Sequence, residues 1–263
     1  MDLGLRGKVA LVAAASKGLG RACAEELAAE GAHVVICARG GDALARTRDE
    51  IAAATGADVH AVVADVSTVA GIELVAREAL GRFGHVDVLV NNAGGPPSGP
   101  FEKHAWDAWQ NAVDLTLRSA VELTRAVLPG MRERKWGRIV NVTSIAVKQP
   151  VDGLILSNSI RSAVTGWART LANEVARDGV TVNCVLPGYT RTERVEQLNA
   201  ANASREGVDV VEIQRRIEAQ IPMRRLGEPR EFGALVAFLA SERATYITAQ
   251  SIPVDGGWIR SLL

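Results

Sequence analysis

Two short stretches of the chain carry side chains that could hold and protonate an oxygen atom. An apolar stretch from Gly137 ends in Ser144, and thirteen residues later Ser157 begins a helical turn that leads to Arg161. Because they are four residues apart in a predicted helix, Ser157 and Arg161 lie on one face of it. Hydroxyl groups can donate hydrogen bonds to a carbonyl oxygen, and a guanidinium can stabilise the negative charge that reduction places on that oxygen. The pattern therefore predicts a polar site where chemistry on an oxygen atom could take place.

An acid is available on a second predicted helix. Residues 101–131 show helical spacing of apolar side chains, and Asp114 lies among apolar neighbours. We expect Asp114 to pair with Arg161 or to order a water molecule that supplies a proton. An acid on a solvated helix face is the alternative interpretation.

These side chains need a scaffold, and the start of the chain predicts a βαβ unit. An apolar run at 8–13 is typical of a strand buried on both faces, and a second such run is found at 33–38. Between them, Gly18 and Gly20 open a segment with helical spacing. Glycines at such a turn let the backbone approach a phosphate, which the first N–H groups of the helix can bind. A nucleotide site is therefore predicted at this turn.

Strand and helix signals continue to alternate to the end of the chain without a linker. Asp65 and the pair Asn91-Asn92 follow predicted strands, at the edge where ligands collect in a parallel sheet. Further strands are predicted at 59–64, 86–90, 137–144, 180–186 and 250–254. The pattern predicts one α/β domain over residues 1–263.

Composition and charge exclude several classes of protein. The chain is 48% hydrophobic with a net charge of zero, so neither nucleic acid nor an anionic membrane is an expected partner. No apolar run is long enough to span a bilayer, and the N-terminus shows no cleavable apolar segment, so a cytoplasmic protein is expected. The cysteines and histidines lack metal-ligand spacing, which predicts no metal site. Buried reduced thiols are predicted for Cys23, Cys37 and Cys184.

With these motifs in place, the sequence resembles the short-chain dehydrogenase/reductase family along nearly its whole length. The family's T-G-x-x-x-G-x-G motif corresponds to residues 13–20, its N-N-A-G motif to 91–94, and its P-G motif to Pro187-Gly188. Residues 254–257 resemble the family's C-terminal turn. The resemblance implies a doubly wound parallel sheet, the Rossmann fold, with seven strands and helices on both faces. It also implies that the cofactor is bound by Ala14, Ser16, Lys17, Gly18, Leu19, Gly20, Arg39, Asp65, Val66, Asn92, Ala93, Gly94, Pro187, Gly188 and Thr192.

The resemblance implies a nicotinamide cofactor and favours NADP(H) over NAD(H). Members that prefer NADP place cations such as Lys17 and Arg39 around the 2′-phosphate, which an arginine can bind with two hydrogen bonds. Members that prefer NAD usually carry an acid where this chain has Ala38. Two solvated surface cations are the alternative interpretation. Ala14 replaces the first glycine of the motif and adds a methyl group where the backbone approaches the cofactor.

The catalytic positions of the family are changed in this chain. The family uses Ser, Tyr and Lys with an ordering Asn, and the matching positions here are Ser144, Ser157, Arg161 and Asp114. An aliphatic hydroxyl is far less acidic than a phenol, and Arg161 cannot relay a proton. Carbonyl reduction or alcohol oxidation with a non-standard proton donor is therefore predicted. The alternatives are a non-catalytic nucleotide-binding protein, and a non-redox lyase or isomerase that uses Asp114 as a base.

Further features surround the predicted site. Residues 190–222 are polar and helical, where the family carries a mobile substrate lid. Tyr189 is a candidate for packing against the cofactor or for acid catalysis, and His104 near the mouth loop is a candidate for approaching the substrate. The family pairs the helices predicted at 101–131 and 155–177 between subunits, which implies a homotetramer or homodimer. The substrate is expected to be a small molecule, and the residues at the mouth do not identify its class.

Overall fold

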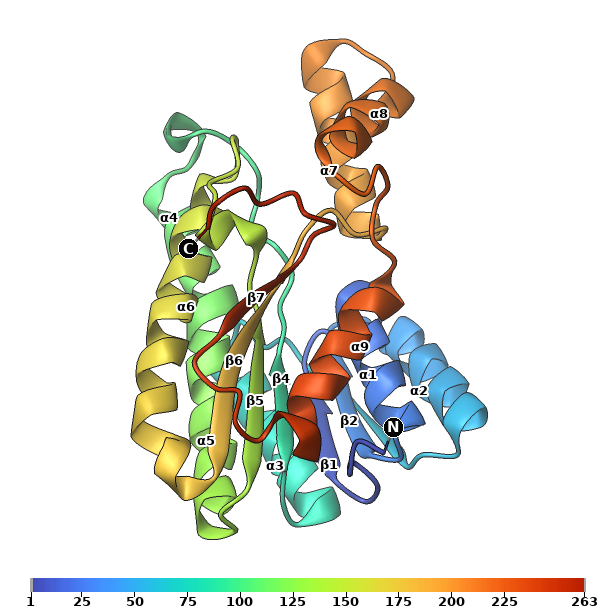
Figure 1. The fold of residues 1–263 in the computed structure, drawn as a ribbon, viewed down its shortest axis with the longest axis vertical. Helices are drawn as coiled ribbons and strands as arrows, with labels where there is room; N and C mark the ends of the chain where they lie inside the picture. Colours follow the sequence, from blue (N-terminus) through green and yellow to red (C-terminus); the bar gives the residue numbers. More distant parts are fainter. Residues whose placement is uncertain (1, 263) are drawn as a thin grey trace.

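A seven-stranded parallel sheet forms the centre of the molecule (Figure 1). The structure is a computed structural model and describes residues 2–262. The strands lie in the order β3-β2-β1-β4-β5-β6-β7, and every neighbouring pair is parallel. Their bounds are β1 Val9–Val12, β2 His33–Ala38, β3 Val59–Val63, β4 Val88–Asn91, β5 Gly137–Val142, β6 Val180–Pro187 and β7 Ser251–Val254. The predicted doubly wound α/β fold is confirmed.

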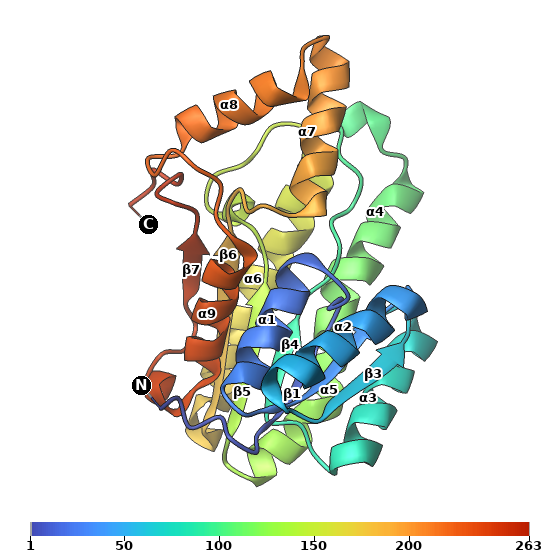
Figure 2. The same cartoon turned by 90° about the vertical axis from the view of Figure 1, so that its right-hand side faces the viewer.

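Helices cover both faces of this sheet (Figure 2). One face packs against α1 (Gly18–Ala29), α2 (Gly41–Thr55) and α9 (Pro229–Ala240). The other face packs against α3 (Val69–Phe83), α5 (Ser119–Glu133) and α6 (Ile155–Val175). The short 3₁₀ helices are η1 Phe101–Lys103, η3 Ile145–Val147, η4 Ala176–Asp178 and η5 Glu242–Ala244.

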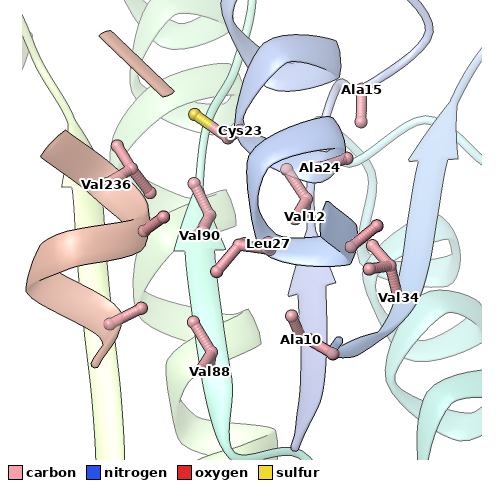
Figure 3. Packing of buried hydrophobic residues seen from close by; sticks show 14 of the residues in the cluster. Ala10, Val12, Ala15, Cys23, Ala24, Leu27, Val34, Val88, Val90 and Val236 are labelled. Atoms are coloured by element: carbon pink, nitrogen blue, oxygen red, sulfur yellow. The ribbon is translucent and has the colours of Figure 1, made fainter. Parts of the chain in front are cut away.

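Each central strand is buried on both sides, which explains its continuous apolar sequence. Successive side chains of a strand point to opposite faces. Ala10 and Val12 of β1 therefore pack with α1 and α9 (Figure 3), whereas Leu11 packs into the core on the other face. Leu27 of α1 and Val236 of α9 belong to the first of these cores.

The strand order reverses between β1 and β4. β2 and β3 lie on one side of β1, and β4 to β7 follow on the other side. Doubly wound folds bind their ligands at the carboxyl ends of the strands at this reversal. Both the turn at 13–20, after β1, and the loop at 91–94, after β4, lie there.

The segment 101–131 differs from the single helix predicted for it. After η1 it contains α4 (Trp106–Ala112), a π-helical turn η2 (Val113–Arg118), and then α5. The N–H of Ser119 donates to the carbonyl oxygen of Asp114, five residues back, which is the bond of a π-helix. This wider turn rotates α4 relative to α5. The predicted apolar face is therefore split: it is buried at Ala120, Leu123 and Val127 and only half-buried at Trp109 and Val113.

Two helices, α7 (Glu193–Glu206) and α8 (Val210–Gln220), occupy the segment predicted as a helical lid. They stand at one end of the molecule, beyond the carboxyl ends of the strands (Figure 1). A small apolar core of their own is formed by Ala203, Ile213, Ile217, Ile221 and Leu226.

All three cysteines are buried and free, as the sequence predicts. Burial raises the pKa of each thiol, which makes it unreactive. Among residues 2–262, no helix combines the length and the hydropathy that crossing a membrane requires.

Candidate active site

The turn between β1 and α1 has the close packing of a phosphate-binding loop. A Cβ atom on Gly20 would lie 2.4 Å from the carbonyl oxygen of Ala14. The side-chain amide of Asn92 donates to the carbonyl oxygens of Ala13 and Ala14, at 3.2 and 3.3 Å, and so holds the turn from the other side. The N-cap residue of α1 is Lys17, whose side chain does not cap the helix. The first N–H groups of α1 are therefore available to an anion.

Ala14 keeps the backbone shape that the motif requires. Its φ is 50°, in the left-handed region that glycine adopts without strain, and Gly18 has a φ of 59°. A side chain in this region costs about 1–2 kcal/mol. The chain therefore retains the conformation of the glycine motif although one of its glycines is an alanine.

Asp65 and Arg39 lie near each other at the ends of β3 and β2. The Oδ1 atom of Asp65 accepts hydrogen bonds from the N–H and the hydroxyl of Ser67, at 2.9 and 2.7 Å. Burial opposes ionisation of Asp65, but these hydrogen bonds and the charge of Arg39 outweigh it and lower its pKa. Val66 is buried beside it, and Arg39 is exposed. Within residues 2–262, Arg39 forms no ion pair, so its guanidinium is available to a phosphate.

Lys17 is held by the first residue of α7. Its ammonium group forms an ion pair with the carboxylate of Glu193. Thr192, the N-cap of α7, lies beside the same turn. Its Cγ2 atom is 3.7 Å from the position that a Cβ atom on Gly18 would take. The start of α7 therefore contacts the glycine-containing turn. Glu193 is paired with Lys17, the cation that the sequence predicts to bind the 2′-phosphate.

A Glu193→Gln variant is expected to bind NADPH about 2- to 5-fold more tightly than the wild type. The substitution frees Lys17, and an exposed ion pair contributes about 0.2–1 kcal/mol. Titration of NADPH fluorescence at low and high salt measures the effect, which should shrink at high salt. Glu196→Gln, an exposed acid on the same helix, is the control. An unchanged dissociation constant for Glu193→Gln would contradict the expectation that Glu193 and the cofactor phosphate compete for Lys17.

The P-G loop crosses the end of β6 in close contact with β7. A Cβ atom on Gly188 would lie 2.6 Å from the Cα atom of Asp255, and its N–H donates to the carbonyl oxygen of Val254 at 2.9 Å. Only glycine fits this approach. The contact fixes the path of the chain from Pro187 to Thr192, which ends beside the glycine-containing turn.

Arg161 links α6 to the end of β5. Its Nη1 atom donates to the carbonyl oxygens of Val142 and Thr143, both at 2.8 Å, and its Nη2 atom lies 3.5 Å from the carbonyl oxygen of Ala93. Only 7% of Arg161 is exposed. Burial lowers the pKa of Arg161, and the charge of Arg194 lowers it further, to about 10. The guanidinium therefore stays charged at neutral pH.

These contacts of Arg161 hold α6 over the end of β5, where both serines are found. Ser144 follows β5, and its hydroxyl oxygen accepts the N–H of Ala146 at 3.1 Å. Ser157 lies one turn before Arg161 on the same face of α6 and is half-buried. Within the described part of the chain, neither hydroxyl donates to a protein acceptor, so both can donate to a substrate oxygen.

Asp114 does not pair with Arg161, and that expectation is wrong. Its carboxylate binds Arg118 at 2.9 Å and the side-chain amide of Gln110 at 3.1 Å, both on its own helical segment. The π turn η2 is the physical reason, because it changes the direction in which the residues around Asp114 point. The predicted pair with Arg161 is therefore excluded, whereas a role for Asp114 in ordering a water molecule or as a base stays a prediction.

Thr116 and Ser119 face the site in place of Asp114. They line a cavity of about 10 Å³ together with Asn91 and Asn141. Among the described residues, Thr116 Oγ1, Asn91 Oδ1 and Asn141 Nδ2 have no hydrogen-bond partner. Buried polar atoms normally have one, and a space of this size suits about one water molecule. Periodicity did not point to these residues, because it does not show a π turn.

Arg194 is a site residue that the sequence did not single out. Its Nη2 atom donates to the carbonyl oxygen of Pro96 at 2.8 Å, which spans from α7 to the loop after β4. Its Nε and Nη2 atoms lie 3.0 Å from the position that a Cβ atom on Gly95 would take. Burial lowers its pKa. Nothing local distinguishes Arg194 from Arg191, which binds Glu228 at 3.0 Å on the surface.

A larger cavity of about 450 Å³ lies between α7, α8 and the loop at 149–152. Tyr189 and Trp258 line it, with ring centroids 5.9 Å apart in an edge-to-face arrangement. Burial raises the pKa of Tyr189, which opposes a role as the acid. His104 lies against Gly99 in the mouth loop, where a Cβ atom would be 3.0 Å from its Nε2. The larger cavity has the size of a small-molecule site.

Known proteins resemble the chain over nearly its full length. A family profile described as enoyl-(acyl carrier protein) reductase matches residues 13–259. A 3-oxoacyl-(acyl-carrier-protein) reductase of Vibrio cholerae is 36% identical over 255 residues, which cover 97% of this chain and 98% of the relative. A D-beta-hydroxybutyrate dehydrogenase of Cupriavidus necator is 36% identical over 263 residues, covering 97% and 99%. The crystal structure of L-sorbose reductase from Gluconobacter frateurii, complexed with NADPH and L-sorbose, matches with a TM-score of 0.95, 35% identity and 100% of both chains.

Proposed function

The chain belongs to the short-chain dehydrogenase/reductase family, and from this membership we propose that it reduces a carbonyl compound with NADPH as the hydride donor. The observation that carries the proposal is the arrangement of Ser144, Ser157 and Arg161 at the end of β5, at the same edge of the sheet as the glycine-containing turn. The relative bound to NADPH supports the choice of cofactor.

The residues of this edge fit a dinucleotide. Gly20 leaves no room for a side chain, the start of α1 is uncapped, and Arg39 forms no ion pair among residues 2–262. We propose that the phosphates are held by 14–20 and Arg39, with Lys17 joining when it leaves Glu193. Asp65 and Val66 would border the adenine half. The nicotinamide half would be bordered by Asn92, Ala93, Gly94, Pro187, Gly188 and Thr192. Bound there, the cofactor supplies a hydride to the substrate carbonyl carbon.

The protein side chains act on the substrate oxygen. Ser144 and Ser157 donate hydrogen bonds to it, and Arg161 stabilises the negative charge that develops on it. The hydroxyl of Ser157 then gives its proton to the alkoxide, and water restores that proton to the serine. A serine hydroxyl and the product alcohol have similar acidity, so this transfer is nearly balanced in free energy. Arg161 keeps its charge throughout and acts electrostatically.

The absence of a tyrosine acid lowers the expected rate. A positioned general acid contributes about 10²- to 10⁴-fold, and an aliphatic hydroxyl supplies little of that factor. Ketones activated by electron-withdrawing groups are therefore the substrates expected to react fastest.

We further propose that α7 and α8 act as a lid and that the protein is a homo-oligomer, dimer or tetramer. The start of α7 already spans from the glycine-containing turn to the loop after β4, through Glu193 and Arg194. Trp106, the first residue of α4, and Phe101 of η1 are 74% and 63% exposed, which is typical of a surface that a partner subunit covers.

Purified protein with NADPH and a panel of activated ketones is expected to show ketone-dependent loss of NADPH absorbance. Ser144→Ala is expected to lower kcat about 100-fold, the usual effect of removing one donor to a developing oxyanion. Ser162→Ala is the matched control, because Ser162 is exposed on α6 and its hydroxyl donates to the carbonyl oxygen of Asn158.

Three other outcomes would contradict this function. An undiminished rate for Ser144→Ala removes its assigned role. NADPH binding without turnover of any ketone indicates a non-catalytic nucleotide-binding protein. Product formed without consumption of NADPH indicates non-redox chemistry.

A further inference from the structure

Two guanidinium groups contact the loop that follows β4. Arg161, from α6, reaches the carbonyl oxygen of Ala93, and Arg194, from α7, binds the carbonyl oxygen of Pro96. Neither arginine forms an ion pair with any carboxylate among residues 2–262, and Asp114 is bound to Arg118 instead. The site therefore holds two cations and no acidic side chain that neutralises them.

Another buried arginine shows how this fold neutralises such a charge. Arg138 is 2% exposed, donates to backbone carbonyl oxygens as Arg161 does, and stacks on Trp136 with 4.3 Å to the ring centroid. The acid Glu242 also acts on its charge. Among the described residues, Arg161 has neither an aromatic ring nor an acid beside it, and the charge that acts on it is that of Arg194. An unpaired buried cation is costly, and a second cation beside it adds to the cost.

The two side chains also have donors to spare. A guanidinium carries five N–H donors. Arg161 uses three of them on carbonyl oxygens, one at the long distance of 3.5 Å, and Arg194 uses one. The remaining donors belong to planar groups that bind oxyanions with paired hydrogen bonds. The site thus has positive charge that is not neutralised and N–H donors that are not used, and an anion would satisfy both.

The cofactor does not supply that anion in the proposed arrangement. Its phosphates lie at the start of α1 and at Arg39, and its nicotinamide half is the part that borders Arg161. The substrate is the other molecule that enters the site. On the basis of the proposed function, we propose that the substrate is a keto acid whose carboxylate binds Arg194, while Arg161 faces the carbonyl oxygen. Arg194 is then the residue that sets substrate class, and it lies on the lid, so that the substrate itself draws α7 onto the site.

Matched substrates test this proposal. Acetoacetate and pyruvate are compared with their methyl esters, which keep the ketone and remove the charge. The wild type is expected to prefer each acid in kcat/KM. Arg194→Gln is expected to reduce the acid-to-ester ratio about 10- to 100-fold, the loss of one charge-assisted contact, mainly through KM. Arg194→Lys should restore part of the ratio. Arg191→Gln, which removes an exposed arginine just before α7, should leave it unchanged.

Binding measurements separate this proposal from the proposed function. If neither acid nor ester is reduced, the proposed function fails, and calorimetric titration with 3-hydroxybutyrate in the presence of NADP⁺ still tests the carboxylate site. Binding of 3-hydroxybutyrate that is lost in Arg194→Gln and kept in Arg191→Gln supports the carboxylate site at Arg194. Equal kcat/KM for acids and esters, or an acid-to-ester ratio unchanged in Arg194→Gln, overturns it. Inorganic phosphate that competes with NADPH through Arg194, without any carboxylate effect, assigns the arginine to the cofactor and also overturns it.

Discussion

A Gly20→Ala variant is expected to weaken NADPH binding about 100-fold while the protein remains folded. The added Cβ atom would lie 2.4 Å from the carbonyl oxygen of Ala14 and 2.7 Å from Nδ2 of Asn92. Neither group can simply withdraw, because the Asn92 amide is hydrogen-bonded to the same turn. The turn must therefore move away from the start of α1, and overpacking of this kind costs about 1–3 kcal/mol. That energy corresponds to about 5- to 150-fold in affinity, with the upper part of the range expected where backbone must shift.

Fluorescence titration with NADPH measures the dissociation constant, and thermal unfolding without cofactor checks the fold. Gly81→Ala is the matched control, because Gly81 is exposed on α3 and nothing lies within 4 Å of an added Cβ atom. That variant should bind NADPH as the wild type does and gain about 0.5–1 kcal/mol of stability from the better helix former. A dissociation constant for Gly20→Ala within about threefold of the wild type would show that the cofactor does not bind at this turn.

The double variant Ser157→Tyr with Arg161→Lys is expected to raise kcat for ketone reduction about 10²- to 10⁴-fold, the contribution of a positioned general acid. It places a phenol and an ammonium at positions four apart on one face of α6, where a cation lowers the pKa of a neighbouring phenol. The ammonium has three donors, enough for the carbonyl oxygens of Val142 and Thr143 that Arg161 now binds. Ser144 is already in place to hold the substrate oxygen.

Steady-state rates with an activated ketone measure this gain, and the pH profile of kcat identifies its source. A phenol acid should add a limb in which kcat falls as the pH rises through the pKa of the tyrosine, because only the protonated phenol donates. Ser157→Phe with Arg161→Lys has the same ring without the hydroxyl and should show no gain. If the tyrosine variant folds and binds NADPH but is no faster than the wild type, the remaining site is not arranged for carbonyl reduction.

Several parts of the fold could be predicted because their causes are local. The continuous apolar runs of β1 and β2 mark strands buried on both faces, and Gly18 and Gly20 mark the turn where the first helix begins. Ser157 and Arg161 share a helix face simply because they are four residues apart. The resemblance to the family rests on such short motifs, and the family profile and the relatives confirm it.

The partners of the charged residues were decided by tertiary structure. Asp114 was predicted to meet Arg161, but the π turn η2 gives it Arg118 and Gln110, and a single wider turn leaves no trace in hydrophobic periodicity. Lys17 was assigned to a phosphate, yet it meets Glu193, a residue 176 positions away.

Ser157 and Arg161 show what the sequence by itself determined: which residue types stand at the predicted catalytic positions, and that they share one helix face. Arg194 shows what only the folded chain decided. It binds a carbonyl oxygen 98 positions away and places a second cation beside Arg161. Periodicity reports which side of an element is buried, because residues at a fixed spacing along the chain fall on one face of a helix or strand. The environment of a charge depends on which distant elements pack against it, and those distances exist only once the sheet and the lid helices have come together.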